Sequence, residues 1–520
     1  MSDNLSVRLD RAALRIARDF PGPGGACAVL KDGEVLVRHA WGYANSERRI
    51  AFTPKSLFRI CSITKQFTCA SVLAAFPDPT ALDDAIRARL PNLGESAPDA
   101  LALAHNQSGL RDYWAVAMLH GSPVEAPFGD TEAARVIAGS RSLQFAPRAR
   151  YSYCNQNFRI LGDALAEKTG RSLAEHLRTS IFGPAGMESA VLAADTRALP
   201  DGTEGYEGSQ AGGFRAAENR IIWTGDAGMA ASLDDMIAYE RWVDATRDDA
   251  SALYSRLSAP VAFGNGAEAT YGFGLGRNME FDRRVTSHGG ALRGWRSHRL
   301  YAPDERISVV VMFNHLSDAR AAAMDLFAAA IGAKAPSHRS DAPAPDWLGA
   351  WVDPETKLSV RLDTPEPGRV RLRFGHWPEV LDLQADGSAT SPGGTRLIPE
   401  GGGLRMERPA ENQSTRLTRC AEGQATDVAG IFRCAELDSD LTVSDGGGVL
   451  FGGFSGFLGQ GRMEQLEPIA RDVWALPCWR ALDHTPPGDW TVAFERDGQG
   501  RVVRAVVGCW LARGLVYERI

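Results

Sequence analysis

The feature that most constrains the fold of this chain is a change of pattern at residues 333–346. Before this segment the run MDLFAAAIG has the apolar periodicity of a helix, whereas AKAPSHRSDAPAPD has the Pro, Ser and Asp content of an interdomain linker. Helical patterns alternate with short strand patterns before the linker, including a strand pair joined by Asp32-Gly33, and only short alternating runs follow it. The sequence therefore predicts an α+β part followed by an all-β part.

The all-β part contains a weak internal sequence repeat. LGAWVDPETKLSVRLD at 348–363 resembles AGIFRCAELDSDLTVSD at 429–445, since each has a small-residue turn, an aromatic residue, acids and a strand. The repeat predicts two modules, and we place the domains at residues 1–335, 336–422 and 423–520. Each module has room for a closed antiparallel barrel of about eight short strands, with a paired β-sandwich as the alternative.

Composition and charge exclude several classes of protein. The 520 residues carry 57 Lys and Arg against 64 Asp and Glu, and the net charge of −7 is spread without the basic blocks that nucleic-acid binding requires. The N-terminus lacks the apolar run of a signal peptide or a membrane span, which predicts a cytoplasmic protein. The eight cysteines form no CxxC pair and have no His at ligand spacing, so we expect free thiols and no metal site.

The first candidate catalytic pair is Ser62 and Lys65, within LFRICSITKQFTCASVLAAF. Apolar residues recur after Ser62 at helical spacing, which predicts that it opens a buried helix with Lys65 on the same face. A serine hydroxyl is a weak nucleophile at pH 7, and a lysine amine held close in a low-dielectric pocket can take its proton. A Ser-x-x-Lys spacing is also expected about once by chance in a chain of this length, so the pair needs support from elsewhere.

Two further segments offer that support. Tyr153 and Asn155 precede the amphipathic run FRILGDALAEKTG, and a phenol beside the pair would relay a proton to a leaving group while Asn155 orients substrate amides. His288, Gly289 and Gly290 lie in TSHGGALRGW ahead of a strand pattern, where glycines let a substrate backbone approach a strand edge. Taken singly, the tyrosine could be a packed core residue and the histidine a turn residue.

In this order the segments resemble the motifs of the penicillin-recognising serine hydrolases: SxxK at 62–65, YxN at 153–155, and HxG at 288–290 in the position of KTG. Two departures are Pro147-Arg148, where relatives usually have Pro-Gly, and Cys154, where Ser is common. Four other segments also look like this family, so the resemblance spans about residues 10–330: HNQSGLRDY (105–113), IFGPAGM (181–187), GDAGMAASLDDM (225–236) and YGFGLG (271–276).

The resemblance implies a fold and a set of roles. The first domain would be an antiparallel sheet covered by helices on both faces, with an all-helical lobe and with Ser62 opening the central helix. Ser62 would be the nucleophile, Lys65 its general base and Tyr153 a proton relay, with His288 at the same site and no metal or organic cofactor required. The oxyanion hole would be the backbone N–H groups of Ser62 and Ala291, where negative charge develops in the tetrahedral intermediate.

The expected substrate follows from His288 and from the all-β part. Family members that bind a substrate carboxylate generally have Lys in the third motif, and an imidazole is a weaker anion anchor. Through all three domains the chain is similar to the D-stereospecific aminopeptidases of the family, which implies removal of N-terminal D-Ala, D-Ser or Gly from peptides, amides and esters. In that resemblance a loop of the last domain contacts the substrate α-ammonium. The matching segment is residues 477–488, with Asp483 as the candidate partner, although this acid could instead be a surface turn residue.

Other functions stay open from the sequence alone. An esterase or a β-lactamase-like hydrolase would share all three motifs. A binding protein that has lost catalytic activity would use the barrels as ligand modules. The presence of Ser62, Lys65 and Tyr153 argues against an inactive binding protein. The resemblance further implies a homodimer and inhibition by β-lactams, and nothing in the sequence predicts a nucleic-acid or membrane partner.

Overall fold

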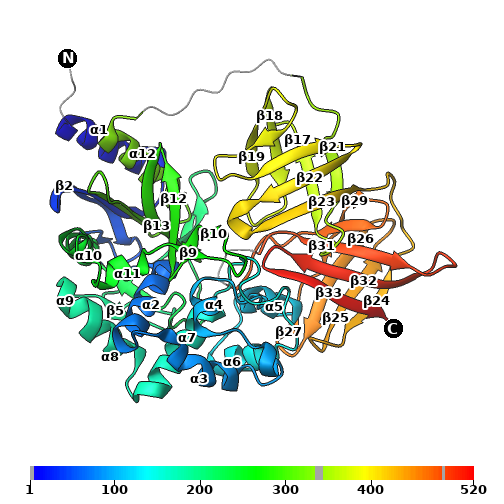
Figure 1. The fold of residues 1–520 in the computed structure, drawn as a ribbon, viewed down its shortest axis with the longest axis horizontal. Coiled ribbons are helices and arrows are strands. Elements are labelled where there is room, and N and C mark those ends of the chain that lie inside the picture. The colour runs from blue at the N-terminus through cyan, green and yellow to red at the C-terminus, as the bar shows by residue number, and fades with distance from the viewer. Residues whose placement is uncertain (1–4, 334–342, 483–486) are drawn as a thin grey trace.

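The structure is a computed structural model that describes residues 5–333, 343–482 and 487–520. Its first part is organised around an eight-stranded antiparallel sheet with the strand order β11-β12-β13-β14-β15-β1-β2-β3 (Figure 1). The strands are β1 (Gly24–Lys31), β2 (Glu34–Asn45), β3 (Ile50–Ala51), β11 (Tyr271–Gly272), β12 (Leu275–Glu280), β13 (Arg283–Leu292), β14 (Trp295–Ala302) and β15 (Ile307–Phe313).

Helices cover both faces of this sheet, as predicted. Strand β1 shows why, because Ala26 and Ala28 belong to one apolar core whereas Cys27 and Val29 belong to the core on the opposite face. Helices α1 (Leu5–Asp19) and α12 (Ala319–Ile331) complete the second core. Helices α2 (Thr64–Ala75) and α10 (Leu233–Thr246) contribute to the first.

Two local predictions are confirmed in this part. The β1–β2 hairpin turns at Asp32-Gly33, whose φ angles of 54° and 76° are the positive values that a type I′ turn requires. The amphipathic run after Asn155 is helix α7 (Gln156–Thr169), which ends at Gly170 in the left-handed conformation. Further helices complete the lobe beside α7: α3 (Asp83–Arg89), α4 (Ala100–Ala104), α5 (Tyr113–Leu119) and α6 (Asp130–Ala138).

The first module after the linker is a closed barrel of eight antiparallel strands, as expected. Its apolar side chains alternate along the strands, as Val370 and Leu372 do, and fill a core of their own. The strands are β16 (Gly349–Val352), β17 (Ser359–Asp363), β18 (Arg369–Arg373), β19 (Glu379–Leu383), β20 (Ala389–Thr390), β21 (Arg396–Glu400), β22 (Gly403–Arg408) and β23 (Gln413–Arg419).

The last module differs from the closed eight-stranded barrel that we expected, because it is a ten-stranded sheet with an open strand order. Strand β28 (Glu464–Gln465) pairs with β26, and β29 (Glu467–Ala470) pairs with β30, so the chain changes partner at the buried Leu466. The other strands are β24 (Gly430–Cys434), β25 (Ser439–Asp445), β26 (Leu450–Gly456), β27 (Gly459–Gln460), β30 (Val473–Leu476), β31 (Trp490–Arg496), β32 (Val502–Cys509) and β33 (Ala512–Arg519).

Both β modules lie against the first part of the chain (Figure 1). Leu482 of the last module belongs to the apolar core of the first part, and Ala115 and Leu119 of α5 belong to the core of the last module. The predicted boundary at 335–336 lies outside the described residues, and that at 422–423 falls between β23 and β24, so both stay predictions. Within the described ranges, no helix has both the length and the apolarity that a bilayer span requires.

Candidate active site

Ser62 lies in a short 3₁₀ turn, Cys61–Ile63, that leads directly into α2. Cys61 has a φ of 52°, a left-handed conformation that turns the chain sharply just before the serine. Strand β13 packs closely on this turn at Gly290, where an added Cβ would lie 2.3 Å from the Ile60 carbonyl oxygen and 2.1 Å from Ser297 Oγ. Gly290 therefore has a packing reason to lack a side chain, because β13 lies directly against the segment that carries Ser62.

Lys65 is fully buried and connects three parts of the site. Its Nζ lies 2.9 Å from Ser62 Oγ, 2.9 Å from Asn155 Oδ1 and 2.8 Å from the carbonyl oxygen of Asp226. The amide and backbone oxygens can only accept, so they engage two N–H groups of the amine. In a neutral lysine these contacts leave the lone pair available to the Ser62 hydroxyl, which is the geometry of a nucleophile beside its base.

Tyr153 completes this group. Its phenol is hydrogen-bonded to Ser62, and Lys65 Nζ lies 5.0 Å from the centre of its ring. Burial raises the pKa of the Tyr153 phenol well above its usual value, and the hydrogen bond to Ser62 offsets only part of that rise. The phenol is thus protonated at neutral pH and can donate a proton.

Sequence reasoning missed two residues that orient the acceptors around Lys65. The Asp112 carboxylate accepts hydrogen bonds from the backbone N–H and from Nδ2 of Asn155, at 2.7 and 2.9 Å, which directs Asn155 Oδ1 toward Lys65. Tyr113 donates to Asp226 Oδ2 at 2.5 Å. The segments GLRDY and GDAGM, which contain Asp112, Tyr113 and Asp226, carried the family resemblance, but nothing in the sequence showed which side chains they would meet. Asn155 is therefore held by Lys65 and Asp112 rather than presented freely to substrate.

His288 is a neutral imidazole in this site. Burial, followed by the nearby Lys65 charge, lowers its pKa to about 3. Its Nδ1 lies 2.6 Å from the Gly289 carbonyl oxygen, which can only accept, so Nδ1 carries the proton. Its Nε2 then accepts from the Tyr271 hydroxyl at 3.0 Å. Both ring nitrogens are engaged within the protein, which makes His288 a poor anchor for a carboxylate.

The other predicted site residues that the structure describes lie along β13. Strand β12 pairs with β13 only as far as Gly276 opposite Ser287, so beyond that point the described strands accompany β13 on its β14 side alone. This open edge carries Gly289, where an added Cβ would meet nothing nearer than 3.5 Å, and Ala291. Asp483 lies outside the described residues.

Comparisons with known proteins define the class and then the family. A family model described as "Beta-lactamase" matches residues 14–334, and one described as "D-aminopeptidase, domain B" matches residues 340–518. A D-aminopeptidase of Gluconobacter oxydans is 57% identical over all of both chains, and one of Brucella ovis is 45% identical over 97% of each. The chain belongs to the D-aminopeptidase family. Among solved structures, an octameric penicillin-binding protein homologue from Pyrococcus abyssi is 19% identical, has a TM-score of 0.53 and covers 79% of this chain and 99% of its own, which supports the fold.

Proposed function

We propose that this protein is a serine aminopeptidase that removes N-terminal D-residues, such as D-Ala, D-Ser or Gly, from peptides, amides and esters. The observation that carries the proposal is the contact between Lys65 and Ser62, beside two further contacts of the lysine to oxygens that can only accept. The full-length similarity to D-aminopeptidases supports the choice of substrate.

The reaction is acyl transfer in two halves. Lys65 takes the Ser62 proton while Ser62 Oγ forms a bond to the carbonyl carbon of the first residue. The C–N bond then breaks as Tyr153 gives its proton to the departing amine, and the phenol regains a proton from protonated Lys65. In the second half Lys65 takes a proton from water as the water oxygen bonds to the ester carbon, and the same proton returns to Ser62 Oγ when the C–O bond breaks and the amino acid leaves. The backbone N–H groups of Ser62 and Ala291 stabilise the oxyanion of each tetrahedral intermediate.

Selectivity for a free amine is assigned to Asp483. This acid follows Leu482, which is buried in the core of the first part, so the preceding chain enters the catalytic domain. A carboxylate removed from water and paired with an ammonium favours substrates that carry that charge. The neutral His288, with both ring nitrogens engaged, fits an enzyme that does not select a C-terminal carboxylate.

The testing experiment compares D-alanine p-nitroanilide with its L-enantiomer and with its N-acetyl form. The D-form with a free amine should be cleaved with the highest kcat/KM of the three. Equal cleavage of the D- and L-forms would contradict the stereospecificity, and equal cleavage of the free and acetylated forms would contradict the aminopeptidase assignment.

Three further properties extend the proposal. β-Lactams with a free amine should compete with substrate, because the Ser62–Lys65 site can take the lactam as an acyl donor. We also propose a homodimer, from the family resemblance, and a cytoplasmic location. Light scattering coupled to size-exclusion chromatography tests the first of these two, and cell fractionation tests the second.

A further inference from the structure

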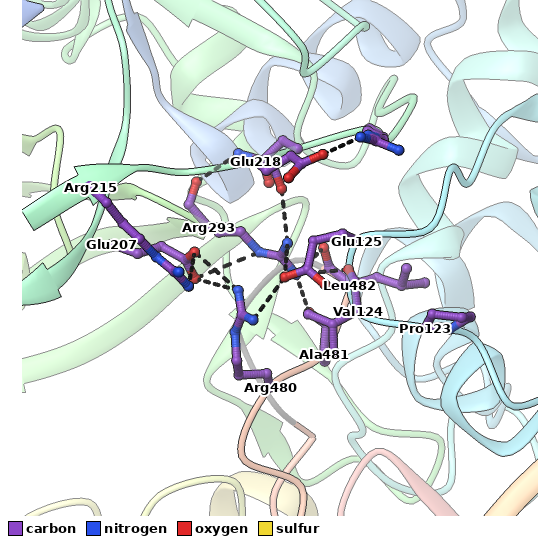
Figure 2. A network of polar contacts seen from close by, with 12 residues as sticks. Pro123, Val124, Glu125, Glu207, Arg215, Glu218, Arg293, Arg480, Ala481 and Leu482 are labelled. Carbon is purple, nitrogen blue, oxygen red and sulfur yellow. Dashed lines mark hydrogen bonds and ion pairs between the residues drawn. The ribbon is translucent and has the colours of Figure 1, made fainter. Parts of the chain in front are cut away.

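Arg293 is a fully buried arginine two residues beyond Ala291, directly after the end of β13. Figure 2 shows its guanidinium at the centre of a polar network drawn from separate parts of the chain. The group donates hydrogen bonds to four backbone carbonyl oxygens: those of Glu218 at 2.8 Å, Val124 at 2.9 Å, Ala481 at 2.7 Å and Leu482 at 3.2 Å. One side chain thus joins two segments of the catalytic domain to the start of the last domain's loop.

Two carboxylates balance the charge of this buried group. Glu125 lies 3.6 Å from Arg293 and Glu207 lies 3.8 Å from it. The same two acids pair with Arg480, at 2.8 and 3.0 Å respectively (Figure 2). Two arginines and two glutamates therefore alternate across the domain boundary, and the network ties residues 480–482 to the catalytic domain through side-chain charges as well as backbone hydrogen bonds.

The choice of arginine has a physical reason. A guanidinium is planar and presents five N–H donors in a rigid fork, whereas a lysine ammonium is a compact point charge with three donors. Only the fork can reach carbonyl groups of three separate segments in fixed directions. A lysine at position 293 would keep the positive charge but would not direct its N–H groups toward all of these carbonyl oxygens.

We propose that Arg293 is a positioning residue which, with the Arg480–Glu207 and Arg480–Glu125 pairs, holds residues 480–482 of the loop in place relative to the strand that carries Ala291. Its backbone continues from the strand that carries Ala291, and its side chain holds Ala481 and Leu482, directly before Asp483. The network thereby restricts the enzyme to substrates whose ammonium stands on the same residue as the reacting carbonyl, so that one residue is removed at a time. This inference rests on the proposed role of the loop.

The first test uses Arg293→Lys and Arg480→Met in the full chain, with D-alanine p-nitroanilide and its N-acetyl form as substrates. We expect the ratio of kcat/KM for the free amine to that for the acetylated form to fall about 10-fold or more in each variant, chiefly through the KM of the free amine. The rate at which p-nitrophenyl acetate, which has no ammonium, acylates Ser62 should change less than about 3-fold.

Two control variants separate positioning from general damage. Arg215→Met removes an exposed arginine that lies 3.7 Å from the same Glu207. Arg299→Lys alters an equally buried arginine of β14 whose partner is Glu240 of α10. Both controls should keep the substrate ratio of the wild type, even where Arg299→Lys lowers the thermal midpoint.

Hydrogen exchange of the peptide containing residues 477–482 supplies a readout that does not depend on turnover. Exchange there should accelerate about 10-fold or more in Arg293→Lys and Arg480→Met, and stay unchanged in Arg215→Met. Suppose that Asp483→Asn narrows the substrate ratio while Arg293→Lys and Arg480→Met leave both the ratio and the exchange unchanged. The positioning role of Arg293 is then wrong, and the proposed role of the loop still stands. If Asp483→Asn leaves the ratio unchanged, the proposed role of the loop fails, and this inference fails with it. If Arg293→Lys does not fold, the results with Arg480→Met test the positioning role instead.

Discussion

The catalytic centre and the loop of the last domain are held in place by different kinds of contact. The centre is built within the first part of the chain, where Lys65 meets Ser62, Asn155 and Asp226 at 2.8–2.9 Å. The start of the loop is held from another domain, by carbonyl contacts to Arg293 and by ion pairs of Arg480. Because each region depends on its own set of contacts, we expect bond breaking and choice of substrate to be separable in this protein.

The largest expected effect comes from breaking the centre itself. Ser62→Ala and Lys65→Ala should each abolish turnover, a loss on the order of 10⁴-fold or more, because nucleophile and base act as a unit. The circular dichroism spectrum should remain that of the wild type. Substantial residual hydrolysis in either variant would show that the centre lies elsewhere.

Asp483→Asn tests the other side of the comparison. Loss of the carboxylate should lower kcat/KM for D-alanine p-nitroanilide by roughly 30- to 1000-fold, the range of a desolvated charge pair. The N-acetyl form carries no ammonium, so the variant should cleave it better than the wild type does, because a carboxylate is no longer desolvated without a partner. Steady-state kinetics on both substrates would reveal changes of opposite sign; parallel changes would remove Asp483 from the amine site.

A smaller effect is expected from the residues that orient the contacts of Lys65. Asp112 accepts hydrogen bonds through Oδ1 from the backbone N–H groups of Trp114 and Ala115 and through Oδ2 from Asn155, so Asp112→Asn puts an amide donor against one of these sets and weakens the support of Asn155. We expect kcat to fall about 10- to 100-fold with KM nearly unchanged for both substrates, because the lysine loses an acceptor. Tyr113→Phe is the matched milder variant, since Lys65 contacts the backbone of Asp226 and not its carboxylate. A selective loss for the free amine alone would contradict the separation of the two regions.

The smallest effect concerns acid pH. Because the pKa of His288 is lowered to about 3, the folded state binds fewer protons at this residue than the unfolded chain between about pH 6.5 and 3. The stabilising contribution is present above pH 6.5 and is lost as the pH falls through this window, by about 1 kcal/mol per pH unit. The thermal midpoint of His288→Gln should therefore fall less steeply from pH 7 to 4.5 than that of the wild type. The pH profile of wild-type kcat/KM should show no step from His288 between pH 5 and 8.

Sequence reasoning predicted those features whose signal is local. Asp32-Gly33 could be identified because a two-residue turn has its own chemistry, and the helix that follows Ser62 because apolar residues recur along it. The role of Arg293 could not be foreseen, since its partners are backbone carbonyls in three distant segments and a carbonyl group has no sequence signature. The same holds for Asp112, whose partner lies 43 residues away. The open order of the last sheet depends on a change of partner at Leu466 that no periodicity marks.

The burial of Leu482 in the core of the first part also bears on the order in which the protein is made. During translation the chain that forms the central sheet and the serine helix leaves the ribosome long before residue 482 does. Domains generally fold as they emerge, at about 5–20 residues per second, so a nascent catalytic domain waits several seconds or more with an apolar site that only the distant C-terminal region can fill. Leu482 is consequently the last residue of that buried core to be synthesised, so its contacts are added to a core whose other members are already present.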